Sequence, residues 1–137
     1  MQKVLVDSNV ILDIATLDPV WHDWSANALA SCVERCALVI NPVIYAEVSV
    51  GFASIEEMSA AVPQSDFEYA QLPWEAAFLA GKCFLQDRKN GGSKRSPLPD
   101  FFIGAHAAVN KMALLTRDSR RYRTYFPTVQ LICPESN

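Results

Sequence analysis

The sequence predicts an α/β fold in which helices flank a central parallel sheet. Short, unbroken apolar runs of strand length occur at residues 4–6, 37–40 and 113–115, and segments with helical spacing separate them. Strands that are buried on both faces of a parallel sheet are expected to be continuously apolar. Strands that alternate with helices favour right-handed crossovers and a parallel strand order.

The first half of the chain shows two helix starts. Asp18-Pro19 predicts an N-cap and a proline in the first turn of a helix that continues to Val33. Asn41-Pro42 predicts the same arrangement for the helix that follows the second strand.

The second half of the chain continues the alternation of strands and helices. A capping box begins at Ser54, and a short third strand is expected within residues 67–72. A long helix is expected over residues 74–89, and a last strand over residues 129–132. The inward face of the long helix is predicted from its small residues, which are Ala77, Ala80 and Gly81, with Phe84.

The composition is that of one ordinary globular domain over residues 1–137. Half of the residues are hydrophobic and 20% are charged, and four cysteines are scattered along the chain, so free thiols are expected. No apolar run approaches the roughly twenty residues of a membrane span. No signal-peptide pattern opens the chain. We therefore expect a soluble, cytoplasmic protein with no membrane partner.

The net charge of -3 conceals an asymmetry between the two halves of the chain. Residues 1–75 carry eleven acids and two bases, whereas residues 76–137 carry ten bases and four acids. A basic C-terminal half can attract a polyanion on one face, although charges also gather on solvated helices by chance.

Two carboxylates follow apolar runs of strand length. Asp7 ends the first run, and Asp118 comes shortly after the run at 113–115. The carboxyl ends of parallel strands form the edge where open α/β folds bind ligands. For Asp7 a role as a simple helix N-cap remains an alternative.

Two further acids lie on predicted helices next to the same edge. Glu47 stands in the apolar stripe of Val43 and Ile44, where a carboxylate without partners is costly, and its side chain leans toward the helix N-terminus. Its alternative is a stripe-boundary glutamate that pairs with a Lys or Arg. Asp100 follows Pro99 at a helix start, and its alternative is an ordinary N-cap.

Convergence of these four acids would require a compensating positive charge. Two like charges about 4 Å apart repel by roughly 4 kcal/mol at an effective dielectric constant of about 20. Oxygen ligands without histidine or cysteine favour Mg²⁺ or Mn²⁺. Such a site can activate water and stabilise the charge that develops on a phosphate.

The acidic motifs together resemble those of PIN-domain ribonucleases, most closely the VapC-type toxins of toxin–antitoxin pairs. The resemblance spans essentially the whole chain. The motifs are Val-Leu-Val-Asp7-Ser-Asn-Val, Glu47 after Pro42, Asp100-Phe-Phe-Ile-Gly-Ala-His-Ala, and Leu-Leu-Thr116-Arg-Asp118 with Tyr122 four residues on.

The resemblance implies a PIN-like three-layer fold with strand order 3-2-1-4-5, and it implies roles for particular residues. The implied metal-site acids are Asp7, Glu47, Asp100 and Asp118, and the implied supporting hydroxyls are Ser8 and Thr116. Ser8 stands where threonine is very frequent in the family. His106, next to the third motif, is expected to lie off the inward helix face and to take no part in catalysis.

The implied activity is Mg²⁺- or Mn²⁺-dependent endonucleolytic cleavage of RNA. The resemblance also implies a homodimer and neutralisation by a small antitoxin. Apolar surface for such partners is expected at Trp21, Trp24 and the helix of Ile55 and Met58. A rim that binds RNA is expected at Lys94, Arg95, Arg120 and Arg121, with Tyr122 stacking on a base.

Other functions remain open at this point. A phosphatase of the haloacid-dehalogenase type also begins with an aspartate after its first strand, but it needs an Asp-x-Asp pattern, and position 9 is Asn. A solitary RNA-processing PIN nuclease and a PIN fold that acts only as a binding module are the remaining alternatives.

Overall fold

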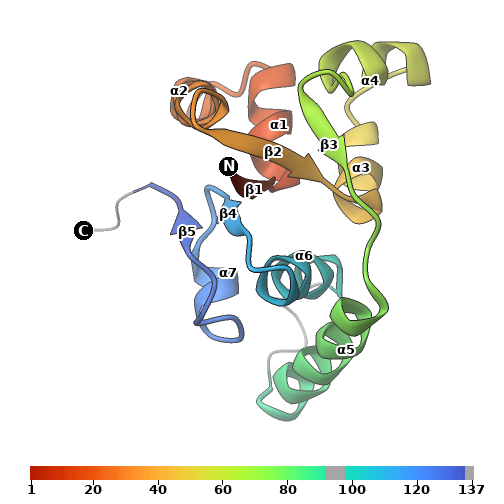
Figure 1. Cartoon of the computed structure of the whole chain (residues 1–137), viewed down its shortest axis with the longest axis vertical. Helices are drawn as coiled ribbons and strands as arrows, with labels where there is room; N and C mark the ends of the chain where they lie inside the picture. The colour runs from red at the N-terminus through yellow and green to blue at the C-terminus, as the bar shows by residue number, and fades with distance from the viewer. Residues whose placement is uncertain (92–97, 135–137) are drawn as a thin grey trace.

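The protein folds around a fully parallel sheet with strand order β3-β2-β1-β4-β5, which confirms the predicted topology (Figure 1). The computed structural model describes residues 1–91 and 98–134. The strands are β1 (Gln2–Val6), β2 (Cys36–Ile40), β3 (Phe67–Tyr69), β4 (Ala113–Leu115) and β5 (Leu131–Ile132). The helices are α1 (Ser8–Ala15), α2 (His22–Val33), α3 (Pro42–Ser49), α4 (Ile55–Ala61), α5 (Trp74–Lys89), α6 (Leu98–Val109) and α7 (Arg120–Arg123).

Helices cover both faces of the sheet. Figure 1 shows α1 and α2 on one side, and α6 with α5 outside it on the other. Because β1 is the central strand, its last three residues, Val4, Leu5 and Val6, are fully buried. From β1 the strand order runs outward through β2 and β3 on one side and through β4 and β5 on the other. The order thus reverses between β1 and β4, and the carboxyl ends of strands at such a point are where open α/β sheets bind their ligands.

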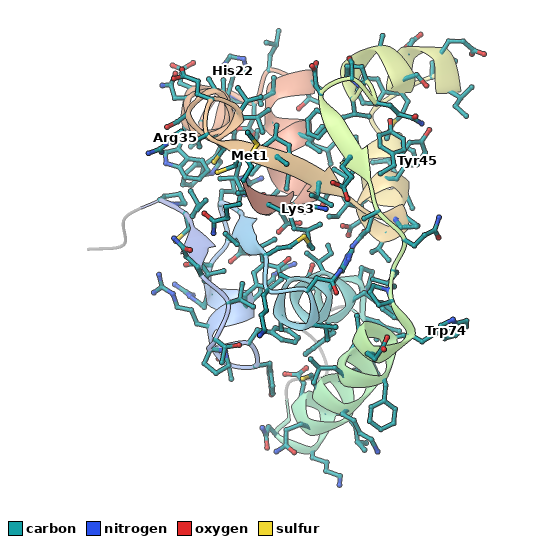
Figure 2. All side chains as sticks on the ribbon, viewed as in Figure 1. Met1, Lys3, His22, Arg35, Tyr45 and Trp74 are labelled. Carbon is teal, nitrogen blue, oxygen red and sulfur yellow. The ribbon has the colours of Figure 1, made fainter. Side chains whose placement is uncertain are left out.

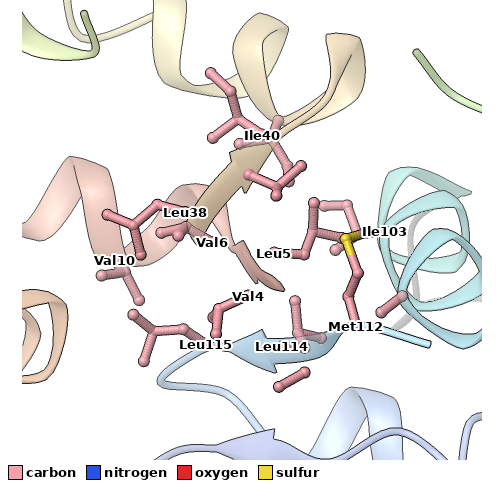
Figure 3. Close-up of a cluster of buried hydrophobic side chains, with 14 of the residues drawn as sticks. Val4, Leu5, Val6, Val10, Leu38, Ile40, Ile103, Met112, Leu114 and Leu115 are labelled. Carbon is pink, nitrogen blue, oxygen red and sulfur yellow. The ribbon is translucent and has the colours of Figure 1, made fainter. Parts of the chain in front are cut away.

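Side chains of β1 alternate between the two layers of the core. In Figure 3, Val6 faces Val10 of α1, whereas Leu5 faces Ile103 of α6 and Met112. All five residues are buried hydrophobics. This alternation is the two-residue period of a strand, and it locks the register of β1 because a one-residue slip would exchange the two faces.

The caps of α1 and α3 agree with the sequence. The Asp7 carboxylate accepts a hydrogen bond from the Ser8 backbone N–H, so Asp7 is the N-cap of α1 as well as the end of β1. The Asn41 side chain accepts from the Ile44 N–H at 2.9 Å, and Pro42 occupies the first turn of α3.

Two helix starts differ from the prediction. The Asp18 carboxylate accepts hydrogen bonds from the Val20 and Trp21 N–H groups, which caps a turn directly before α2, and α2 itself begins at His22. Helix α6 begins at Leu98, so Asp100 lies inside the first turn and is not an N-cap.

The buried face of α5 is rotated from the predicted one. Ala76 and Ala80 are fully buried, whereas Gly81 is exposed. The opposite face leaves Trp74 88% exposed, and Figure 2 shows it pointing away from the body of the protein. Phe78, one turn further along, is also exposed.

Gly104 allows an aromatic ring to lie directly on α6. A Cβ atom at this position would lie 2.3 Å from the ring of Phe126, which is itself buried. The sequence suggested that small residues of this helix allow close packing on the sheet. At Gly104 the close neighbour is instead the segment between α7 and β5.

The described residues contain no helix long and apolar enough to cross a bilayer. All four cysteines are free, as expected.

Candidate active site

Asp7 lies at the carboxyl end of β1 with both carboxylate oxygens hydrogen-bonded. Its side chain is 3% exposed. Oδ2 accepts hydrogen bonds from the Thr116 and Tyr122 hydroxyls, both at 2.8 Å, and Oδ1 accepts from the Ser8 N–H at 2.8 Å. Asn9 Nδ2 adds a longer contact of 3.4 Å to Oδ2. These donors hold the carboxylate in one orientation, because they come from α1, from α7 and from the residue that follows β4.

Glu47 reaches the same edge from α3. The Ser8 hydroxyl donates to Glu47 Oε1 at 2.8 Å and lies 3.4 Å from Asp7 Oδ1. Ser8 thus links the two acids, which lie 40 residues apart in the chain. The helix directs Glu47 back toward the strand ends, as expected from the tilt of helical side chains.

Asp100 and Asp118 are joined by an arginine. Arg121 donates from an Nη atom to Asp100 Oδ2 at 2.6 Å, and its Nε lies 3.1 Å from Asp118 Oδ2. Thr116 fixes the loop that carries Asp118, because its hydroxyl accepts from the Asp118 N–H at 3.1 Å while it donates to Asp7. The structure therefore brings all four predicted acids, Ser8 and Thr116 to one edge of the sheet.

Burial raises the pKa of three of these acids. For Asp7 the hydrogen bonds from Tyr122, Thr116 and Ser8 oppose the rise. The pKa of Glu47 is raised by burial, opposed by the Ser8 hydrogen bond and increased further by the charge of Asp7. The pKa of Asp100 rises to about 6, because burial and the charges of Asp7 and Glu47 outweigh Arg121. The charged forms of these three acids are thus disfavoured, because the hydrogen bonds and Arg121 offset only part of the cost of burial.

A second network, which the sequence analysis missed, supports the loop after β4. Asp13 of α1 is buried, accepts from the Ser25 hydroxyl and forms a 2.8 Å ion pair with Arg117. The Arg117 guanidinium also lies 5.6 Å from the Trp21 ring. The backbone N–H of Arg117 donates to the Asn9 side-chain oxygen at 3.3 Å. An acid in the middle of an apolar helix was the only signal for this network in the sequence.

Tyr122 corrects the prediction for RNA stacking. Its side chain is 1% exposed and its hydroxyl donates to Asp7, so its ring cannot stack on an RNA base. Burial, followed by the charge of Asp7, raises its pKa well above the ordinary value, which keeps the hydroxyl a donor. Tyr122 therefore orients an acid of the site.

The predicted basic rim divides into three cases. Arg121 lies among the acids and is not simply a rim residue. Arg120, its neighbour in α7, is exposed. Lys94 and Arg95 lie outside the described residues.

His106 is fully buried, although the sequence suggested a position off the inward face of α6. Its Nδ1 lies 3.0 Å from Asn41 Nδ2. Because Asn41 uses its oxygen to cap α3, its amide nitrogen is the donor to His106. Burial lowers the pKa of His106, so it supports the fold as a neutral residue.

The predicted partner surface is largely internal. Met58 is buried, and Trp21 and Trp24 are half-buried and pack edge to face. Of the predicted set only Ile55 is well exposed. The larger exposed aromatic side chains are Trp74 and Phe78 on α5.

The donor set matches a hard divalent cation, although its present arrangement is closed around Arg121. Carboxylate and hydroxyl oxygens are the ligands that Mg²⁺ and Mn²⁺ prefer. Within residues 1–91 and 98–134, no three acidic, histidine or cysteine side chains already surround one position for an ion. The positive group between Asp100 and Asp118 is the guanidinium of Arg121.

The fold and the site together define an α/β domain with a carboxylate cluster at the switch point of a parallel sheet. The chain belongs to the PIN-domain family, whose sequence model matches residues 4–127. A comparison with curated protein sequences found no match.

Solved structures share this fold. VapBC2 from Rickettsia felis, bound to a promoter DNA fragment, matches with a TM-score of 0.73 at 17% identity, over 96% of this chain and 98% of that chain. VapBC-1 from nontypeable Haemophilus influenzae gives the same four values. DNA-bound VapBC from Salmonella typhimurium matches with a TM-score of 0.69 at 19% identity, over 97% and 98%. At these identities the likeness establishes the shared fold.

Proposed function

We propose that the protein is a divalent-metal-dependent endoribonuclease and the toxin of a toxin–antitoxin pair. The observation that carries this proposal is the convergence of four acids from separate elements at the carboxyl edge of β1 and β4. Two of them, Asp7 and Glu47, share one serine donor, and the other two, Asp100 and Asp118, share one arginine. Membership of the PIN-domain family supports a nuclease over a phosphatase.

The residues that would hold Mg²⁺ or Mn²⁺ are Asp7, Asp100 and Asp118, with Glu47 completing the site directly or through water. When bound, such an ion supplies water activation and neutralises charge on the phosphate. The Thr116 and Tyr122 hydroxyls orient the Asp7 carboxylate, and their hydrogen bonds oppose the rise in its pKa that burial causes.

Orientation of these acids is the main contribution of the surrounding chain. Ser8 holds Glu47 beside Asp7, and Thr116 holds the Asp118 loop beside the same carboxylate. Each support is a hydroxyl or backbone donor on a regular element or at its end, which suits a site that must keep its geometry while RNA binds.

The toxin assignment draws on the structural neighbours. Several are VapBC complexes, and one is described as a toxin–antitoxin complex from Klebsiella pneumoniae. We infer by this likeness that a small antitoxin protein neutralises the chain. We also infer that the chain forms a homodimer, for which exposed Trp74 and Phe78 on α5 offer apolar contact area.

The proposed activity is tested by cleavage of single-stranded RNA with Mg²⁺, with Mn²⁺ and with EDTA. We expect internal cuts that require the metal, and a loss of roughly a hundredfold or more in Asp100→Asn. Asp66→Asn is the matched control, because Asp66 is exposed and precedes β3 at the opposite edge of the sheet. Binding of RNA without metal-dependent cuts would favour a binding module. Cleavage in cells that no co-expressed neighbouring gene suppresses would favour a solitary RNA-processing nuclease.

A further inference from the structure

Arg121 makes the most unusual contact of the site, because one guanidinium joins two predicted metal ligands. Its Nη atom lies 2.6 Å from Asp100 Oδ2 and its Nε lies 3.1 Å from Asp118 Oδ2. The two carboxylates come from different elements, α6 and the loop between β4 and α7. The planar guanidinium therefore bridges them as a divalent ion bridges acids in a metal site.

The neighbouring arginines are placed differently. Arg117 pairs with Asp13, away from the four acids. Arg120 is exposed and is adjacent to Arg121 in the same short helix. The contact at Arg121 is thus a property of that position and is not a general consequence of the basic segment 117–123.

Charge explains why this guanidinium lies among the acids. Four carboxylates that share one edge repel one another, and the repulsion is strongest where they are shielded from water. Asp100 is well shielded, since its side chain is only 12% exposed. An arginine that contacts two of the carboxylates offsets part of this repulsion in the protein without metal.

We propose that Arg121 is the internal counter-cation of the metal-free site, and that a divalent ion binds by displacing its guanidinium from Asp100 and Asp118. The displacement rests on the proposed function, in which these acids are the metal ligands. An ion held by Asp100 and Asp118 would compete with the guanidinium for the same two carboxylates, and the two positive charges would repel each other. Arginine cannot leave by losing a proton, so it has to move.

The position of Arg121 permits this movement. Its side chain is 43% exposed, and α7 is a helix of four residues at the surface. The guanidinium can therefore turn into solvent without opening the core. The opposite view is that Arg121 is a fixed strut between α6 and α7, which stays in place when metal binds.

Metal affinity separates these two views. Arg121→Gln is compared with Arg120→Gln, which removes the same charge from the neighbouring exposed position. Calorimetric titration with Mn²⁺ and with Mg²⁺ is expected to show about tenfold tighter binding in Arg121→Gln, since two partly exposed ion pairs no longer have to be broken. Arg120→Gln is expected to bind metal nearly as the wild type does.

Stability without metal provides a second measurement on the same proteins. In EDTA at pH 8, Arg121→Gln is expected to melt at a lower temperature than Arg120→Gln, because the acids have lost their counter-cation. With saturating Mn²⁺ the two melting temperatures are expected to converge. A lower melting temperature that persists equally with bound metal would indicate the fixed strut and overturn the proposal.

The arginine itself can be followed by NMR. The Nε–H signal of Arg121, assigned by its absence in Arg121→Gln, is expected to move to the position of a free arginine as Mg²⁺ is added. An unmoved signal at saturating Mg²⁺, or equal or weaker metal binding by Arg121→Gln, would overturn the displacement while leaving the metal site intact. Absence of metal binding in all three proteins would instead overturn the proposed metal-dependent function, and the displacement with it.

Discussion

The raised pKa of Asp100 makes the stability of the metal-free protein depend on pH in a predictable direction. The folded pKa is about 6 and the ordinary value is 3.8, with burial as the main cause. The folded state thus binds this proton more tightly than the unfolded state does. The stabilising contribution is complete below about 3.8 and is lost as the pH rises through about 6.

The magnitude follows from the same two values. At 1.36 kcal/mol per pH unit, the difference between 3.8 and about 6 corresponds to roughly 3 kcal/mol of unfolding free energy. Solvent screening reduces this only slightly, because the Asp100 side chain is 12% exposed. Asp100→Asn is neutral at every pH. We therefore expect the variant and the wild type to be similar in stability below about pH 3.8, and the variant to be more stable by up to about 3 kcal/mol at pH 8.

Urea denaturation in EDTA across this pH range is the suitable assay, because guanidinium chloride would screen the charges. Asp66→Asn, an exposed acid at the opposite edge of the sheet, is the control and should follow the wild type throughout. A difference between Asp100→Asn and the wild type that stays constant with pH would refute the argument. So would a variant that is less stable than the wild type at pH 8, since Asp100 would then stabilise the fold as a charged partner of Arg121.

Three further substitutions test the supporting contacts, each by urea denaturation at pH 7. Tyr122→Phe removes a hydrogen bond to buried Asp7 and should lower stability by about 2 kcal/mol; an unchanged value would mean that the other donors to Asp7 suffice. Asp13→Ala breaks the ion pair with Arg117 and should lower stability by roughly 2–3 kcal/mol, which is less than for a fully buried pair because Arg117 is partly exposed. Asp23→Ala, at an exposed position of α2, is its control. Gly104→Ala should lower stability by about 2 kcal/mol through contact with the Phe126 ring, and a neutral effect would mean that the ring moves freely.

The sheet could be predicted well from the sequence, because its buried strands are short, continuous apolar runs. The apolar run before Asp7 and the run before Thr116 become β1 and β4, and both are buried on two faces. The errors occur where local chemistry allows two outcomes. Asp18 was predicted to start a helix, yet its carboxylate caps a turn that precedes α2, and a cap of this kind serves a turn as well as a helix.

The acids of the site could be predicted because strand ends and helix tilt place them at one edge whatever their rotamers. The roles of Arg121 and Tyr122 could not be predicted in this way. Both were expected at the RNA rim, and they lie in the short helix α7. A turn of four residues has no periodicity from which to read its buried side, so only the structure shows that both side chains reach the acids.

The most direct test of the metal site is an anomalous diffraction map from crystals soaked with Mn²⁺. We expect a peak within coordination distance of Asp7, Asp100 and Asp118, with the Arg121 guanidinium turned away from the two carboxylates that it bridges without metal. Crystals of Asp100→Asn should show a weaker peak or none at that position. A well-occupied Mn²⁺ site elsewhere, with Arg121 still between Asp100 and Asp118, would contradict the account.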